Sequence, residues 1–399
     1  MSNSDKRLCE SNEKLEKAVD YILGEGKKQD INKFLKLCEE AAESGNIETQ
    51  FILGKAYLDG CYWLSQFFRT PIKDEAWIEI NEPEKGVKWL EKAGENGDER
   101  AIYALGLVYY WRKLGEPNYK KALEYFYKIA DKDKLAQFNI GLMHEYGNGV
   151  EASIEEAKKW YEKSANNGCK EALFNLASIY YFGKDTGKVN IEESIKWYKK
   201  AIECGYGEGA SAIGIIYEEG YHVEKNLEKA MEYYKLADEL GDSNGALRLG
   251  DLYFNGGYVK KDYSEAMKLY EKSARLGNPL AFYNIGNMFK AGLGVEVDYA
   301  TAVEFFRKAG KLGYIKALVS IGSMYEEGIG FEQDYEKARM FYERAGEFNC
   351  GEGFKRLGNL YEKGLGVERD HLKSFECYKK ATELGVDMTG SLVYELYNK

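Results

Sequence analysis

The chain has 399 residues, 44% of them hydrophobic and 31% charged, a globular composition long enough for a large core. Its 56 basic and 66 acidic residues give a formal net charge of −10, and no basic block occurs. This balance disfavours nucleic acid and anionic membranes as partners, because both attract positively charged surfaces.

Residues 1–11 are polar and are expected to form an extension ahead of the main body. This segment lacks the apolar core of a signal peptide, and no run in the chain reaches the ~18 apolar residues typical of a membrane-spanning helix. The seven cysteines show no recurring pair spacing, which is typical of reduced thiols. We therefore expect a cytoplasmic protein.

A repeat of 36 residues occupies residues 12–399, which we expect to form a single domain. Its marker is a small residue, in most copies the glycine of an "LG" or "IG" pair, at Ala18, Gly54, Gly106, Gly141, Ala177, Gly214, Gly250, Gly286, Gly322 and Gly358. The spacing stays between 35 and 37 residues except after Gly54, where 16 extra residues are inserted. The tail at 391–399 is predicted to be half of an eleventh repeat.

Each repeat predicts two helices. An aromatic residue three positions after the marker, such as Tyr109 or Tyr325, shares one face of the first helix, helix A. Twelve positions after the marker, or thirteen in one copy, stands a short polar residue suited to N-cap the second helix, helix B: Asn118, Ser153, Asn190, Asn226, Asp262, Asp298, Asp334 and Asp370. Two such helices cannot bury their apolar faces alone, so neighbouring copies are expected to stack.

This pattern resembles the Sel1-like repeat family, a relative of the tetratricopeptide repeats. The family motif, A-x-x-x-L-G-x-x-Y-x-x-G-x-G-V-x-x-D-x-x-x-A-x-x-W/F-Y-x-x-A-A-x-x-G, is met almost in full at 281–313. The resemblance implies an all-α fold, a right-handed superhelical solenoid of about ten helix pairs with a C-terminal half-repeat. It also implies a protein-binding adaptor without catalytic activity. The chain departs from the motif at Ala177, at His144 in the aromatic slot, and at Asp133 in the closing-glycine slot.

No motif for catalysis, metal or phosphate binding occurs: HExxH, paired CxxC and the Walker glycine loop are all absent. The three histidines, His144, His222 and His371, stand in slots that other repeats fill with other residues, which indicates drift within the repeat. We predict no enzyme activity, no catalytic residue, no metal and no cofactor.

Helix A of the tetratricopeptide relatives lines a concave groove. By analogy, the positions three before and one, four and five after the marker face the groove here. Near the N-terminus these positions carry Tyr103, Tyr110, Trp111, Phe138, Tyr146, Phe174, Tyr181 and Phe182, whereas near the C-terminus they are mostly polar or charged. Aromatic residues are favoured interface anchors, so we predict a partner site, with Trp111 exposed. The alternative is that curvature buries these rings between repeats.

The insertion, residues 61–80, reads "CYWLSQFFRTPIKDEAWIEI". Its Trp63, Phe67, Phe68 and Trp77 are candidate partner-binding residues, since insertions in repeats often lie on the binding face. The alternative is that the insertion caps the stack, because terminal repeats need modified outer faces. The sequence leaves both open.

The predicted function is a scaffold or adaptor that holds a peptide or protein between these aromatic side chains, with the 61–80 loop closing over it. Two alternatives remain: a solenoid that assembles with itself, and an effector exported without a classical signal. The sequence predicts no oligomeric state and is compatible with a monomer.

Overall fold

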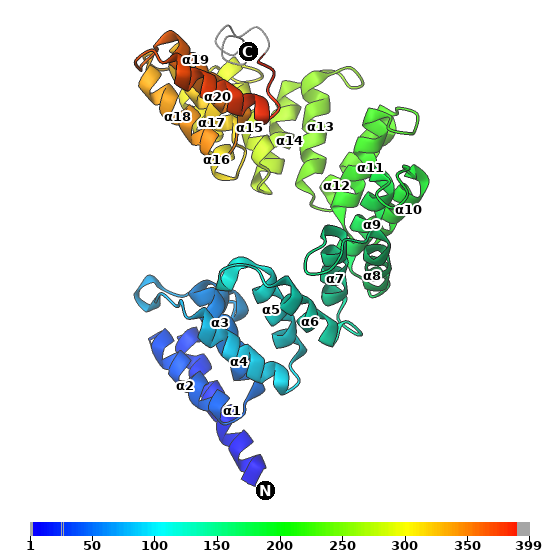
Figure 1. Cartoon of the computed structure of the whole chain (residues 1–399), viewed down its shortest axis with the longest axis vertical. Coiled ribbons are helices and arrows are strands. Elements are labelled where there is room, and N and C mark those ends of the chain that lie inside the picture. The colour runs from blue at the N-terminus through cyan, green and yellow to red at the C-terminus, as the bar shows by residue number, and fades with distance from the viewer. Residues whose placement is uncertain (1–2, 25, 27, 389–399) are drawn as a thin grey trace. The chain divides into compact units, whose positions relative to one another are not determined.

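The computed structural model describes residues 3–24, 26 and 28–388, with side chains from residue 10 onward. Twenty α-helices and two short 3-10 helices make up the regular structure of this part, which contains no strand (Figure 1). The predicted all-α class is confirmed. Odd-numbered α-helices are the A helices of successive repeats and even-numbered ones are the B helices, which gives ten pairs in the described residues.

Two compact units divide the chain, at residues 1–194 and 195–399, and the boundary falls inside α10 (Ile191–Glu203). The helices of the first unit ahead of α10 are α1 (Asn3–Leu23), α2 (Ile31–Glu43), α3 (Ile47–Phe67), η1 (Asp74–Ala76), α4 (Pro83–Glu95), α5 (Glu99–Tyr110), η2 (Arg112–Leu114), α6 (Tyr119–Ile129), α7 (Lys134–Tyr146), α8 (Ile154–Asn166) and α9 (Lys170–Phe182).

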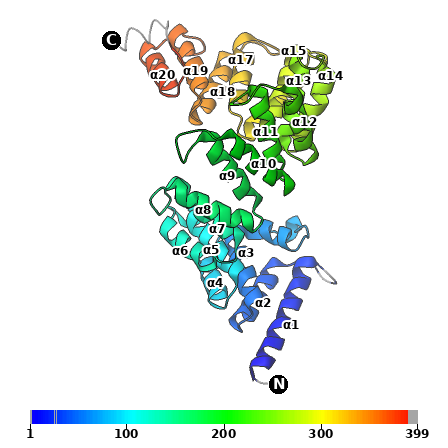
Figure 2. The same ribbon diagram turned by 90° about the vertical axis from the view of Figure 1, so that its right-hand side faces the viewer.

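The second unit continues the alternation of A and B helices (Figure 2). Its helices after α10 are α11 (Gly207–Glu219), α12 (Leu227–Glu239), α13 (Ser243–Asn255), α14 (Tyr263–Arg275), α15 (Pro279–Ala291), α16 (Tyr299–Lys311), α17 (Lys316–Glu327), α18 (Tyr335–Glu347), α19 (Gly351–Lys363) and α20 (His371–Glu383). Leaving α10 aside, consecutive helices within each unit pack against one another.

Helix B lies against helix A at the marker residue. A Cβ atom placed on Gly141 would lie 2.6 Å from the ring of Tyr161, and one on Gly322 would lie 2.5 Å from the ring of Tyr342. Both tyrosines are fully buried. The marker is therefore small because an aromatic ring of helix B fills the space that its side chain would take, and the close approach expected from the sequence is confirmed.

The predicted N-caps begin the B helices. The side-chain oxygen of Asp298, for example, accepts a hydrogen bond from the Thr301 amide at 3.0 Å. The same contact recurs at the other predicted caps, Asn118, Ser153, Asn190, Asn226, Asp262, Asp334 and Asp370. Each such cap stabilises its helix by about 1 kcal/mol. Asp133, which departs from the closing-glycine pattern, instead caps helix α7.

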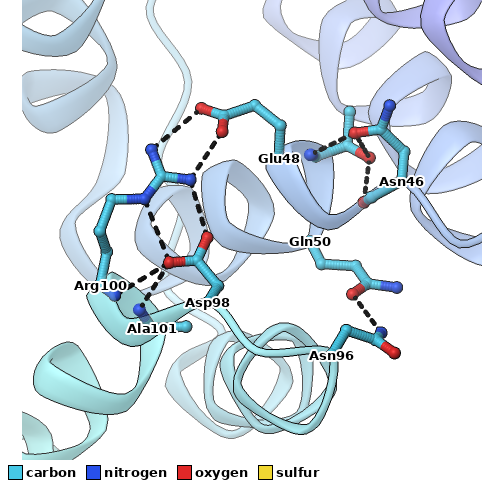
Figure 3. A network of polar contacts seen from close by, with 8 residues as sticks. Asn46, Glu48, Gln50, Asn96, Asp98, Arg100 and Ala101 are labelled. Carbon is cyan, nitrogen blue, oxygen red and sulfur yellow. Dashed lines mark hydrogen bonds and ion pairs between the residues drawn. The ribbon is translucent and has the colours of Figure 1, made fainter. Parts of the chain in front are cut away.

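Polar side chains at the turns between helix B and the next helix A join neighbouring repeats of the first unit (Figure 3). The guanidinium of Arg100 donates to Asp98, the N-cap of its own helix α5, and to Glu48 of α3, at 2.7 and 2.6 Å. The amide of Asn96 donates to the side chain of Gln50 at 3.1 Å. These contacts hold the N-terminal ends of α3 and α5 next to each other.

The predictions made for the two ends of the chain have different outcomes. Helix α1 begins at Asn3, so the boundary expected after residue 11 lies inside a helix. The half-repeat predicted at 391–399 lies outside the described residues. The single domain predicted over 12–399 stays a prediction.

Candidate functional site

Three exposed aromatic side chains stand at equivalent positions of consecutive A helices. Trp111, Tyr146 and Phe182 each follow their marker by five residues, at the C-terminal ends of α5, α7 and α9. Their side chains are 60%, 63% and 62% exposed. We call these three residues the aromatic row. Such repeated exposure of large rings is typical of an interaction surface, because water contact with them is unfavourable.

A second set of predicted residues, three positions before the marker, is half-buried. We call Tyr103, Phe138 and Phe174 the inner row. The ring of Tyr103 lies 5.8 Å from that of Phe126, and the ring of Phe138 lies 5.7 Å from that of Tyr161. Each of these two contacts joins helix A to helix B of the same repeat.

The inner row is therefore part of the packing as well as of the surface. The hydroxyl of Tyr103 accepts a hydrogen bond from the Asn139 amide of the next A helix at 3.2 Å, and burial raises the pKa of Tyr103. On helix A, positions −3, +1 and +5 relative to the marker lie on one face, since they are four residues apart. The inner row and the aromatic row are thus the two ends of one strip on each A helix.

The residues four positions after the marker support the aromatic row. Tyr110 and Tyr181 are both half-buried. The ring of Tyr110 makes an edge contact with Trp111 at 5.1 Å, and its hydroxyl accepts from the Asn148 side chain at 3.3 Å. Tyr181 makes the corresponding edge contact with Phe182 at 4.9 Å. The exposed rings of Trp111 and Phe182 therefore rest on tyrosines that are themselves packed.

The insertion turns back onto repeat 2. Helix α3 breaks at Gly60, whose φ of 71° and ψ of −163° are accessible to glycine but strained for other residues. The turn after Gly60 brings the ring of Trp63 to 6.0 Å from that of Phe51 in an edge contact. Phe67 stacks on Trp63 at 4.7 Å, and Phe68 makes an edge contact with Phe34 of α2 at 5.6 Å.

The later part of the insertion is fixed to the first repeat by Gln29. This buried amide donates to the carbonyls of Ile22 and Pro71, at 2.8 and 3.0 Å, and accepts from the Lys73 amide at 3.0 Å. Ile72 and Ala76 are buried in the same core as Ile22, Phe34 and Leu64. One side of the insertion thus belongs to the N-terminal core, while Trp77 and Phe67 keep 50% and 39% of their side chains exposed.

The charged groups beside the aromatic row are paired within the chain. Lys184 donates to Glu145 at 2.7 Å, and the other oxygen of Glu145 accepts from the hydroxyl of Tyr161 at 2.7 Å. Asp59 of α3 accepts from Lys113 and Lys55. Burial raises the pKa of Asp59, but the two lysine hydrogen bonds outweigh it and hold the pKa below its ordinary value.

The geometry offers little for chemistry in the described residues. No three His, Cys, Asp or Glu side chains of this part gather as the ligands of a metal ion would. Among the helices of this part, none combines the length and apolar character needed to span a bilayer. The described cysteines Cys38, Cys61, Cys169, Cys204, Cys350 and Cys377 are all free thiols.

Sequence reasoning missed two features of this region. Tyr62 is 67% exposed beside the predicted insertion residues, and its place two residues after Gly60 could have suggested that. Gln29 carried no signal in the sequence, because its role depends on a segment more than forty residues away.

Pairs of short helices that recur with a small residue at the A–B contact define a helical repeat protein. The chain belongs to the Sel1 repeat family. Its family model, described as "Sel1 repeat", matches residues 18–46, 77–98, 99–134, 134–169, 170–206, 207–242, 243–278, 279–314, 315–347 and 355–386. The resemblance read from the sequence is confirmed.

Curated relatives match over short stretches. A component of an ERAD-associated E3 ubiquitin-protein ligase, HRD3B of Arabidopsis thaliana, is 31% identical over 93 residues, 22% of this chain and 15% of that protein. The chitin synthase regulator SKT5 of Saccharomyces cerevisiae is 28% identical over 149 residues, 36% of this chain and 19% of that protein. The chain therefore matches less than a fifth of the length of either relative.

Solved structures match over more of the chain. A protective antigen present in uropathogenic Escherichia coli strains is 27% identical with a TM-score of 0.55, over 97% of this chain and 80% of that one. A Sel1 repeat protein from Oxalobacter formigenes is 30% identical with a TM-score of 0.54, over 63% of this chain and 98% of that one. Both likenesses agree with the family membership.

Proposed function

We propose that the chain is a non-catalytic scaffold or adaptor that binds a peptide or protein on the face formed by α5, α7 and α9. The observation that carries this proposal is the aromatic row, three large rings with about the same high exposure in three consecutive repeats. Aromatic side chains supply much of the binding energy of protein interfaces when a partner removes them from water.

The relatives support a role in protein complexes. HRD3B is named as a component of a ubiquitin ligase, and a rat relative, 31% identical over 100 residues, is named as a DAP3-binding protein. The free thiols favour a reducing compartment, and we propose the cytoplasm. That the insertion also contacts the partner stays a prediction, which the exposed rings of Phe67 and Trp77 support.

The test removes the aromatic row. The triple variant Trp111→Ala, Tyr146→Ala, Phe182→Ala and the unchanged full chain serve as baits for affinity capture from lysate. The control triple variant, Tyr258→Ala, Phe348→Ala, Leu372→Ala, removes exposed apolar side chains elsewhere. A partner retained by the unchanged chain is then purified and its Kd measured by calorimetry.

We expect the row variant to weaken binding at least about tenfold and the control to change it little, because truncating a central aromatic anchor typically removes 1 kcal/mol or more. Circular dichroism checks that all three proteins fold. A partner that binds all three proteins equally would contradict the row as the binding surface. A bait that captures only its own copies, with light scattering that rises with concentration, would favour self-assembly instead.

A further inference from the structure

In repeat 2, another segment of the chain covers the A-helix strip and shows which side chains can pack on it. Its strip consists of Phe51, Lys55 and Asp59, at the positions that carry Tyr103, Leu107 and Trp111 in repeat 3. The turned-back insertion lies on this strip, with Trp63 in edge contact with Phe51 and the Lys55 ammonium 5.8 Å from the Trp63 ring. The Arg100 guanidinium also lies over Phe51 at 4.4 Å, and Phe51 keeps only 8% exposure.

The covering segment is a short helical stretch from Cys61 to Phe67. Two of its aromatic rings, Trp63 and Phe67, are four residues apart and stack on each other at 4.7 Å. This is the spacing that places two side chains on one face of a helix. The chain therefore contains its own example of a helical segment that packs an aromatic ring, Trp63, on an A-helix strip, with a second ring, Phe67, stacked on the first.

Repeats 3 to 5 carry a strip at the same positions of helix A, with an aromatic residue at each end. Their connections between helix A and helix B, residues 111–118, 147–153 and 183–190, contain no insertion. The aromatic row at the end of these strips stays more than half exposed, and the inner row stays half-buried instead of buried. Phe51 is thus more buried than the residues of the inner row, and the helix that covers it lies in repeat 2.

The charged residues near the aromatic row favour a partner segment whose contact face is uncharged. Lys184 is paired with Glu145, Lys113 with Asp59, and Arg112 with Glu116 at 3.4 Å. A charged side chain brought onto the row would lose its water and find these counter-charges already engaged. Apolar and aromatic side chains meet no such penalty and bury the exposed rings.

We propose that the aromatic row binds a helical segment of a partner protein that presents aromatic or large apolar side chains four residues apart on an uncharged face. This inference rests on the proposed function and names the chemistry of its partner. Packed helix axes lie at least about 8–10 Å apart, so the three A helices of the row span roughly 20 Å or more. At 1.5 Å per residue, a helical occupant needs at least about 14 residues to reach all three.

The test is a display selection of random peptides of about 16 residues, long enough to span the row as a helix. The baits are the full-length chain, the row variant and the control triple variant described above. Peptides enriched on the first and third baits but not on the second are synthesised. Their Kd for each bait is measured by fluorescence anisotropy, their helicity in the complex by circular dichroism, and their contact positions by alanine scanning.

We expect row-dependent peptides to be helical when bound, with sensitive aromatic or large apolar positions three to four residues apart and few charges among them. We expect the row variant to weaken their binding about tenfold or more, as loss of aromatic anchors does. Row-dependent peptides that bind in an extended form, or through acidic or basic residues, would overturn this inference and leave the proposed function standing. A selection that yields no row-dependent peptide would overturn both.

Discussion

His144 occupies the slot of helix A that neighbouring repeats fill with an aromatic ring. Its Nε2 lies 3.3 Å from the hydroxyl of Tyr127 of α6, while its buried Nδ1 has no hydrogen-bond partner among the described residues. Burial lowers the pKa of His144, and the nearby carboxylate of Glu156 of α8 only partly offsets this. The fold therefore favours the neutral form of the imidazole.

This environment predicts a dependence of stability on pH. Because the pKa of His144 is lower in the folded chain, the unfolded chain binds the proton more readily. Protonation of this histidine therefore lowers the free energy of unfolding. The loss begins as pH falls below the unfolded pKa of about 6.5. We expect His144→Phe to reduce the loss of melting temperature between about pH 7.5 and pH 5.5. The control is His222→Asn, an exposed loop residue at a left-handed position that asparagine tolerates. An equal loss in both variants and in the unchanged chain would contradict the prediction.

The buried Tyr342 of α18 forms a hydrogen bond with a carboxylate of the preceding A helix, α17. Its hydroxyl donates to Glu326 at 2.6 Å, and burial raises the pKa of Tyr342 above its ordinary value. In Tyr342→Phe, Arg356 at 3.9 Å is the remaining partner of the half-buried Glu326 carboxylate among the described residues. We expect the free energy of unfolding to fall by about 1–2 kcal/mol, since a partly buried charged acceptor loses its donor.

Urea denaturation measures that change. The matched control lies in the same helix: Tyr335→Phe removes a hydroxyl that makes no hydrogen bond in the described part of the chain. If the two variants are equally stable, the Tyr342–Glu326 contact does not contribute to stability as we expect.

At the scale of elements, the insertion depends on one side chain of a distant turn. Gln29 satisfies three backbone groups, the carbonyls of Ile22 and Pro71 and the amide of Lys73. Gln29→Met keeps the volume but leaves all three without this partner. We expect a loss of about 1–3 kcal/mol and faster proteolysis at 68–80, because unpaired buried polar groups destabilise the packed state.

Limited proteolysis followed by mass spectrometry locates the cleavage. Gln66→Met, an exposed residue of the same insertion, is the control and is expected to leave the cleavage rate unchanged. Cleavage that is no faster in Gln29→Met than in the control would show that the apolar contacts of Ile72 and Ala76 suffice to hold the segment.

The helix pairs could be predicted because their signals are local. An N-cap such as Asp298 and a marker such as Gly286 act on residues within one repeat, and the same signals recur every 36 residues along the chain. The path of the insertion could not be predicted, since it depends on the Gly60 backbone turn and on Gln29.

The candidate site was predictable in part for the same reason. The exposed rings were expected from their position after the marker, and Trp111 is exposed as predicted. The burial of the inner row depends on contacts with other helices, as between Tyr103 and Asn139, which the sequence does not display. The Trp63–Phe51 contact likewise joins two positions of the strip only after the chain has turned back.

At the scale of the whole molecule, a stack of repeats is held by nearest neighbours, so a local change should spread only to adjacent repeats. Gly141→Ala and Gly322→Ala test this in the two compact units. A methyl group at either position would meet the ring of Tyr161 or Tyr342 at about 2.5 Å, and such overpacking typically destabilises by about 1–3 kcal/mol. The two variants make the same chemical change at equivalent positions, so each serves as the control for the other.

Hydrogen exchange of the backbone amides reads out where stability is lost. For Gly141→Ala we expect faster exchange in α7 and α8 and in their neighbours α6 and α9, with α15 to α18 unchanged. For Gly322→Ala we expect the reverse pattern, with faster exchange in α16 to α19 and none in α5 and α6. Faster exchange along the entire chain in either variant would mean that all repeats unfold as one cooperative body. In the expected case, a partner that covers α5, α7 and α9 would protect those helices and their neighbours without altering the stability of distant repeats.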